Sequence, residues 1–165
     1  MTTRPYWLDA NVFIEANNGF FNLEIAPSFW SWLEEQLEAG VLRTSSLVYA
    51  EILGKDDGLA KWAKVRKGFP YWPEPDGDVQ TVYREIAEYV EEEYRASSPA
   101  KVGDFLGKAD CWIIAHAKAK GGTVVTRESK VDKTSQTPKV PNVCEAFEVP
   151  FIETKELLKL LKFKL

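Results

Sequence analysis

The chain has 165 residues, which is the size of one domain. Its hydrophobic content of 45% and aromatic content of 13% predict a folded protein with a core and exclude a disordered chain. Because the net charge is −4, any binding of nucleic acid would need a local basic patch or bound cations.

The first predicted element is a buried strand over residues 6–14, with the sequence YWLDANVFI. Its aromatic and β-branched residues favour a strand over a helix. Asp9 interrupts this apolar stretch, and a charge placed there is costly to desolvate unless something compensates it. Asn11 is expected on the same side as Asp9 if the strand continues.

Three helices and a short extended segment are predicted next. Apolar residues at helical spacing indicate a helix that Ser28 caps and Gly40 ends. Residues 41–42 are extended, and Ser45 or Ser46 caps the helix that carries Glu51. Residues 54–58 then break that helix, and residues 59–67 form a short basic one.

A proline-rich connector over residues 69–77 leads to a long helix that Asp78 caps and residues 97–99 close. Further elements follow it. They are a helix over residues 108–120 that Gly121 and Gly122 stop, a strand over 123–126, a polar loop over 127–139, a helix over 140–147, a strand over 149–152 and a terminal helix capped by Thr154.

Strands therefore alternate with helices along the whole chain, which favours an α/β domain with a mostly parallel sheet. No internal repeat and no long linker divides the sequence, so residues 1–165 are predicted to form a single domain. The connector over residues 69–77 is interpreted as an excursion between helices.

Cysteine and histidine are scarce. Two cysteines and one histidine argue against a zinc site, and nothing suggests a disulfide scaffold, so a cytoplasmic location is expected. The N-terminus is too short and polar for a signal peptide, and no apolar run is long enough to span a membrane. His116 follows Asp110 by six residues and points away from it on an ideal helix, which indicates a structural role.

Carboxylates lie where a parallel sheet would open into a ligand site, beyond the carboxyl ends of the strands. Asp9 and Glu128 follow predicted strands, Glu51 lies on a helix, and Asp110 opens another helix at its positive end. Glu51 and Glu128 also fit solvated surface acids, and Asp110 fits a helix-start charge. Asp9 is the hardest to explain without a ligand.

Four segments resemble, in order, the motifs of PIN domains. They are LDANVFI at residues 8–14, VYAEI at 48–52, ADCWIIAHA at 109–117 and VVTRE at 124–128. The last departs from the family, whose members often have Asn and then Asp where Arg127 and Glu128 stand. The resemblance covers nearly the whole chain and implies a PIN-like, three-layer α/β/α sandwich around a mostly parallel sheet.

The resemblance also implies a metal-dependent endoribonuclease, the toxin of a VapC-like toxin–antitoxin pair. The implied cofactor is Mg²⁺ or Mn²⁺, hard cations that prefer oxygen ligands and relieve the repulsion between carboxylates. The implied ligands and catalytic residues are Asp9, Glu51, Asp110 and Glu128, with Asn11 and Thr126 in support. RNA, a small antitoxin and a second copy in a homodimer are the implied partners, and no membrane is involved.

The main alternative is a catalytically inactive PIN-like scaffold that binds RNA or protein. Two groups of basic residues could hold RNA phosphates, although solvated lysines explain each residue equally well. They are Lys55, Lys61, Lys64, Arg66 and Lys67, and Arg127, Lys130, Lys133 and Lys139. Trp30, Trp32, Trp62 and Trp72 could stack on bases, but the core is their more natural place. Phe20, Phe21 and Trp32 are compatible with a partner-facing surface.

Overall fold

A parallel sheet forms the centre of the fold in the computed structural model, which describes residues 4–127 and 130–165. The described strands are β1 (Tyr6–Leu8), β2 (Leu42–Arg43), β3 (Thr123–Thr126) and β4 (Phe151–Glu153). Their order is β2-β1-β3-β4, and each neighbouring pair is parallel. The carboxyl ends of all these strands therefore point to the same edge of the sheet.

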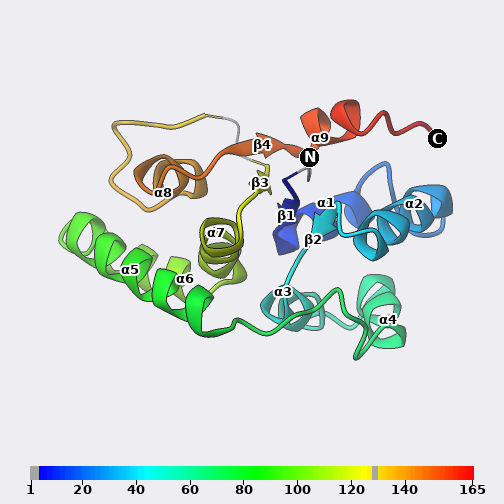
Figure 1. The fold of residues 1–165 in the computed structure, drawn as a ribbon, viewed down its shortest axis with the longest axis horizontal. Helices are drawn as coiled ribbons and strands as arrows, with labels where there is room; N and C mark the ends of the chain where they lie inside the picture. Colours follow the sequence, from blue (N-terminus) through cyan, green and yellow to red (C-terminus); the bar gives the residue numbers. More distant parts are fainter. Residues whose placement is uncertain (1–3, 128–129) are drawn as a thin grey trace.

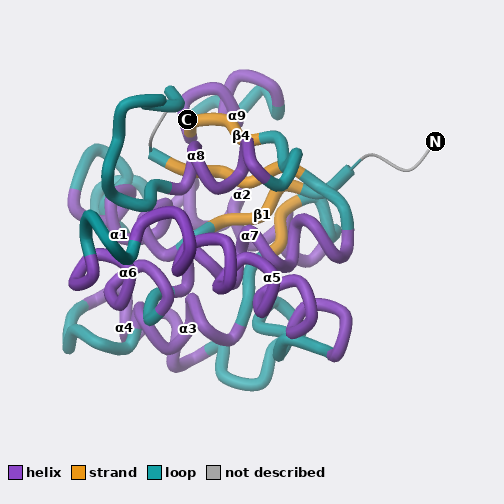
Figure 2. Tube along the Cα trace, turned by 90° about the vertical axis from the view of Figure 1, so that its left-hand side faces the viewer, coloured by secondary structure: helices purple, strands orange, loops and turns teal. Residues whose placement is uncertain are grey.

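Helices cover both faces of the sheet (Figure 1). They are α1 (Ala10–Asn18), α2 (Pro27–Glu38), α3 (Ser46–Ile52), α4 (Gly58–Val65), α5 (Gly77–Tyr94), α6 (Pro99–Leu106), α7 (Ala109–Lys120), α8 (Val140–Ala146) and α9 (Thr154–Leu160). Helix α7 packs on β1 and β3 and also contacts α5, α6 and α8. Helices α1, α2 and α9 lie on the other face of the sheet. The predicted three-layer α/β/α architecture around a parallel sheet is confirmed, and Figure 2 shows the strands enclosed by helices.

The central strand β1 is buried, with Trp7 only 2% exposed and Leu8 fully buried. Its neighbour β3 approaches closely because residue 122 is glycine. A Cβ atom at Gly122 would collide with the carbonyl oxygen of Pro5 and the ring of Trp7. The indole Nε1 of Trp7 donates a hydrogen bond to the carbonyl oxygen of Gly121 at 3.0 Å. This close approach brings the carboxyl ends of β1 and β3 side by side.

The predicted strand over residues 6–14 is wrong beyond Leu8. Asp9 has an extended backbone and caps α1, and its Oδ1 accepts a hydrogen bond from the backbone N–H of Val12 at 3.2 Å. The apolar run that follows is a buried helix, whose pattern cannot be told from a buried strand over so short a stretch. Asn11 therefore lies in the first turn of α1 and not on a strand.

Three predicted caps also differ. Helix α2 begins at Pro27, one residue before Ser28, because proline is favoured in the first helical turn. Asp76, not Asp78, caps α5 by accepting from Val79 N–H at 3.0 Å. Thr154 is the first residue of α9 and not its cap. Ser45 does cap α3, as predicted, and accepts from Leu47 N–H at 3.2 Å.

The core continues from the sheet into an aromatic cluster beneath α1. The ring of Phe13 lies 6.2–6.5 Å from those of Trp30, Trp62 and Trp72. These tryptophans are buried, which confirms the core as their place rather than a base-stacking surface. Across the two described stretches of chain, no helix combines the length and the apolar character needed to cross a membrane.

Candidate active site

The site is built around Asp9, which directly follows β1. The hydroxyl of Thr44, just beyond β2, donates a hydrogen bond to the carbonyl oxygen of Leu8 at 2.9 Å. Both Thr44 and Leu8 are fully buried, so this contact holds the end of β1 in place. Asp9 itself is only 1% exposed, which makes it a carboxylate at the floor of the site.

Two further acids come from α3 and α7. Asp110 lies in the first turn of α7, as predicted. Glu51, near the end of α3, uses its Oε1 to accept a hydrogen bond from the backbone N–H of Ala109 at 2.6 Å. This contact joins α3 to the N-terminus of α7, where a negative charge is favourable. It also holds Glu51 next to the turn that carries Asp110.

The negative charges of Asp110 and Glu51 act on the Asp9 carboxylate. The pKa of Asp9 is raised well above its usual value, first by burial and then by the negative charge of Asp110, with a smaller effect of Glu51. Hydrogen bonds from the backbone N–H groups of Val12 and Asn11 oppose this shift of the pKa. The Asp9 carboxylate is thus destabilised in its charged form, and a nearby cation would relieve that cost.

A cleft of about 280 Å³ opens over these acids. Asp9, Asn11, Asp110 and Thr126 line it, so these four of the six predicted site residues come together. Glu51 is absent from the described lining of the cleft. Its carboxylate instead accepts the hydrogen bond from the backbone N–H of Ala109. Glu128 lies outside the described residues, so its place in the site stays a prediction.

A divalent cation in this cleft would depend on the carboxylates of Asp9 and Asp110. Among residues 4–127 and 130–165, no group of three or more histidine, cysteine, aspartate or glutamate side chains is arranged to hold a metal ion. Mg²⁺, however, is commonly bound through one or two carboxylates, with water and substrate phosphates completing its octahedron. Asp9 and Asp110 fit an ion of that kind. Its positive charge would stabilise the ionised form of Asp9, which burial disfavours.

Positive charge also surrounds the cleft. Arg127 and Lys139 line it, as the sequence suggested, but so do Lys101 and Lys108, which sequence reasoning did not select. Lys101 was missed because α6 was not predicted, whereas Lys108 lay at the start of a predicted helix and carried no signal of its own. Lys101 lies in α6, and Lys108 is the residue that precedes α7.

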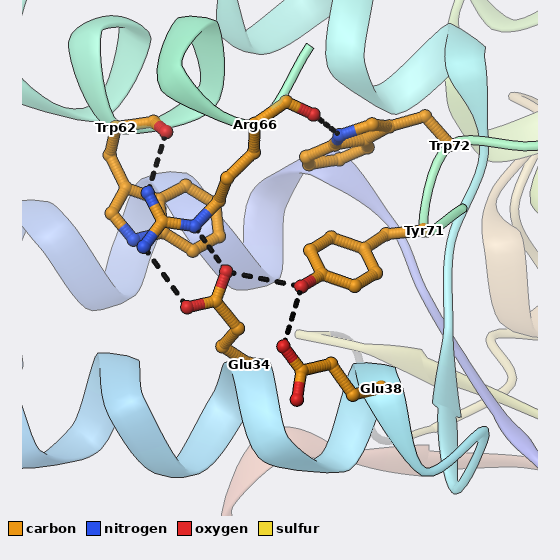
Figure 3. Close-up of polar contacts among 6 residues, drawn as sticks. All are labelled: Glu34, Glu38, Trp62, Arg66, Tyr71 and Trp72. Atoms are coloured by element: carbon orange, nitrogen blue, oxygen red, sulfur yellow. Dashed lines mark hydrogen bonds and ion pairs between the residues drawn. The ribbon is translucent and has the colours of Figure 1, made fainter. Parts of the chain in front are cut away.

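Arg66, expected near the substrate, is instead part of a structural network (Figure 3). Its guanidinium forms two hydrogen bonds with the carboxylate of Glu34, one of them 3.1 Å long, and lies 4.3 Å from the ring centre of Trp62. The hydroxyl of Tyr71 faces both Glu34, at 3.2 Å, and Glu38, at 3.1 Å. Arg66 holds the pKa of Glu34 below its usual range. The network joins α2 to α4 and the connector.

Helix α8 closes the site from the other side. Cys144 in α8 is buried, and burial, with a further contribution from the charge of Asp9, raises the pKa of its thiol. Cys111 is a buried core residue, as predicted. His116 is buried too, and its ring stacks on Trp7 with the ring centres 5.0 Å apart, which confirms a structural role. Neither cysteine nor His116 is placed to act on a ligand in the cleft.

Of the aromatic residues considered for a partner surface, only Phe20 is exposed, at 92%. Phe21 stacks on Phe29 with ring centres 4.4 Å apart, and Trp32 packs against Phe163 at 4.8 Å. Both are half-buried. The expectation of an exposed aromatic surface is therefore correct for Phe20 and wrong for Phe21 and Trp32.

Comparison with solved structures identifies a shared fold. A crystal structure of VapBC2 from Rickettsia felis bound to a DNA fragment from their promoter has a TM-score of 0.52 and 17% sequence identity, over 90% of this chain and 97% of that chain. A crystal structure of FitAcB from Neisseria gonorrhoeae has a TM-score of 0.48 and 19% identity, over 89% of this chain and 96% of that chain. The VapBC2 comparison shows that the two proteins have the same fold.

Sequence comparison gives a family but no activity. Residues 6–165 match the family described as a domain of unknown function, DUF4411. Among curated proteins, no match to this sequence is found.

Proposed function

We propose that this chain, which belongs to the DUF4411 family, is a metal-dependent endoribonuclease and the toxin of a toxin–antitoxin pair. One observation carries the proposal: the buried carboxylate of Asp9 lies beside Asp110 and Glu51, and burial and these charges raise its pKa. A protein keeps such a costly arrangement where function requires it, and sites with strongly shifted pKa values are functional candidates.

Each residue of the site has a separate proposed role. Asp9 and Asp110 would hold an Mg²⁺ or Mn²⁺ ion, Glu51 would act directly or through water, and Glu128 would complete the set. When bound, the ion would supply an activated water as nucleophile and positive charge for the phosphodiester. Asn11 and Thr126, which line the same cleft, would orient the substrate by hydrogen bonds. The fixed ends of β1, α1 and α7 keep these groups in place without the substrate.

Cleavage of RNA is the direct test. Purified protein with Mn²⁺ or Mg²⁺ should cut RNA, and EDTA should stop the reaction. Asp9→Asn and Asp110→Asn should each lower the rate by roughly 100-fold or more, because each removes a ligand. Asp78→Asn, an exposed acid on α5, is the matched control and should cleave like wild type.

Metal binding can be measured separately from cleavage. At an Mn²⁺ concentration of about 100 times Kd, wild type should gain about 2.7 kcal/mol of stability. Asp9→Asn should gain far less, although its amide can still cap α1. A folded wild type that binds RNA but shows neither cleavage nor a response to Mn²⁺ would establish the inactive scaffold instead.

The toxin part of the proposal rests on the motif resemblance to VapC-like toxins and requires a small antitoxin and a homodimer. Phe20 and Ile25, which are 92% and 76% exposed, leave apolar surface between α1 and α2 that a protein partner could cover. A short neighbouring reading frame should encode a protein that copurifies with this chain and suppresses its cleavage. Light scattering of the chain alone should give the mass of two copies, and a monomer would contradict the dimer.

A further inference from the structure

The cleft that holds the acids also concentrates positive charge. Its lining contains four cationic side chains, Lys101, Lys108, Arg127 and Lys139, against three carboxylates, Asp9, Asp104 and Asp110. The whole chain, in contrast, carries a net charge of −4. The cleft therefore gathers cations beside its carboxylates on a negative protein, which suits a ligand that is larger than a metal ion and carries anionic groups.

These cations differ in whether they are already neutralised. Arg127 forms an ion pair with Glu15 at 3.2 Å. In the described part of the chain, no ion pair includes Lys101, Lys108 or Lys139. The first two are exposed and Lys139 is half-buried in the cleft. Their charges remain available to a ligand that enters the site.

Lys101 and Lys139 come from segments that are tied to each other. The hydroxyls of Ser97 and Ser98, just before α6, each donate a hydrogen bond to the carbonyl oxygen of Gln136 at 2.9 Å. Lys101 follows in the first turns of α6, and Lys139 precedes the first residue of α8. The tie thus fixes the two walls of the cleft relative to each other, with the buried Asp9 at its floor.

We propose that Lys101 and Lys139 are positioning residues that bind backbone phosphates of a single-stranded RNA on either side of the phosphodiester held over Asp9 and Asp110. The proposal rests on the proposed function, since it takes RNA as the substrate. Lysine binds phosphate as a point charge and tolerates any base sequence, so these contacts place the strand without reading it. The Ser97 and Ser98 hydrogen bonds set the distance between the two contacts.

The test is RNA binding in EDTA, which prevents cleavage, measured by fluorescence anisotropy of a labelled single-stranded oligonucleotide at several salt concentrations. Each phosphate contact contributes about 0.7 to the slope of log K against log salt concentration for a single strand. Lys101→Gln with Lys139→Gln should therefore lower the slope by about 1.4 and weaken binding by roughly tenfold. Lys101→Gln alone, at an exposed position, should lower the slope by about 0.7.

The control is Lys118→Gln with Lys159→Gln, which removes the same charge from exposed positions on α7 and α9 outside the cleft. It should leave both the slope and the affinity close to wild type. The proposal is overturned if wild type does not bind RNA, if the Lys101 and Lys139 variants keep the wild-type slope, or if the control loses as much. RNA that binds through these lysines and is never cleaved would refute the nuclease and leave this assignment standing.

Discussion

The carboxylate of Glu51 receives the backbone N–H of Ala109 in a hydrogen bond of 2.6 Å. Ala109 is the first residue of α7, and Lys108 before it provides no side-chain cap. Glu51 therefore supplies, from a different helix, the cap that the local sequence lacks. The same contact places the Asp110 turn next to α3.

The first prediction concerns this contact. Glu51→Ala removes the acceptor for the Ala109 N–H and should lower the free energy of unfolding by about 1 kcal/mol, as for the loss of an N-cap. Glu51→Gln keeps an oxygen acceptor and should retain most of that stability. Urea denaturation measures both. Equal losses of stability in the two variants would contradict the capping role. If Glu51→Gln loses cleavage but little stability, Glu51 has a separate role in the active site.

The second prediction concerns His116 and pH. Burial is the main reason that the pKa of His116 is lowered to about 4. Between the ordinary pKa of 6.5 and the value in the folded protein, the unfolded chain binds a proton that the folded chain excludes. Stability should therefore be complete above pH 6.5 and fall by roughly 2–3 kcal/mol as the pH drops toward 4.

His116→Phe should remove this contribution. Phenylalanine can keep the stack on Trp7, and it eliminates a buried Nε2 atom that has no hydrogen-bond partner in the described structure. Denaturation at pH 7.5 and 4.5 gives the comparison: the difference in stability between the variant and wild type should grow at the lower pH. A constant difference would show that His116 does not resist protonation.

The third prediction concerns the network in Figure 3. Arg66→Lys cannot form both hydrogen bonds to Glu34 and loses the planar contact with Trp62, so it should cost about 1 kcal/mol. The matched control is Arg95→Lys, because Arg95 pairs with Glu91 on the exposed face of α5. That pair is exposed to solvent, so its loss should destabilise the protein less than Arg66→Lys does. Thermal and urea unfolding should rank the two variants in this order, and equal effects would contradict it.

The sequence predicted Asp9 and the architecture correctly, but not the length of β1. Asp9 stood out because a charge in an apolar run is costly, and the structure places it at the buried end of β1. The extent of β1 could not be predicted, because Val12, Phe13 and Ile14 suit a buried helix as well as a strand. The order of motifs nevertheless predicted the correct architecture.

Two parts of the site had no clear sequence signal. Helix α6 is short, contains Gly103 and buries only Val102 and Phe105, so its periodicity is weak and Lys101 went unnoticed. The partner of Glu51 is a backbone N–H group, which every residue except proline has. Such a contact depends on how α3 and α7 pack, and that packing is decided by the complete tertiary structure.

The pairing of β1 between β2 and β3 has a consequence for synthesis on the ribosome. Tyr6 is translated more than a hundred residues before its partner Thr123 in the neighbouring strand. Contacts so distant in sequence form late and slowly. A nascent chain would therefore hold β1 without its partner β3 while the intervening helices are made, and Asp9 could not meet Asp110 before α7 has been synthesised.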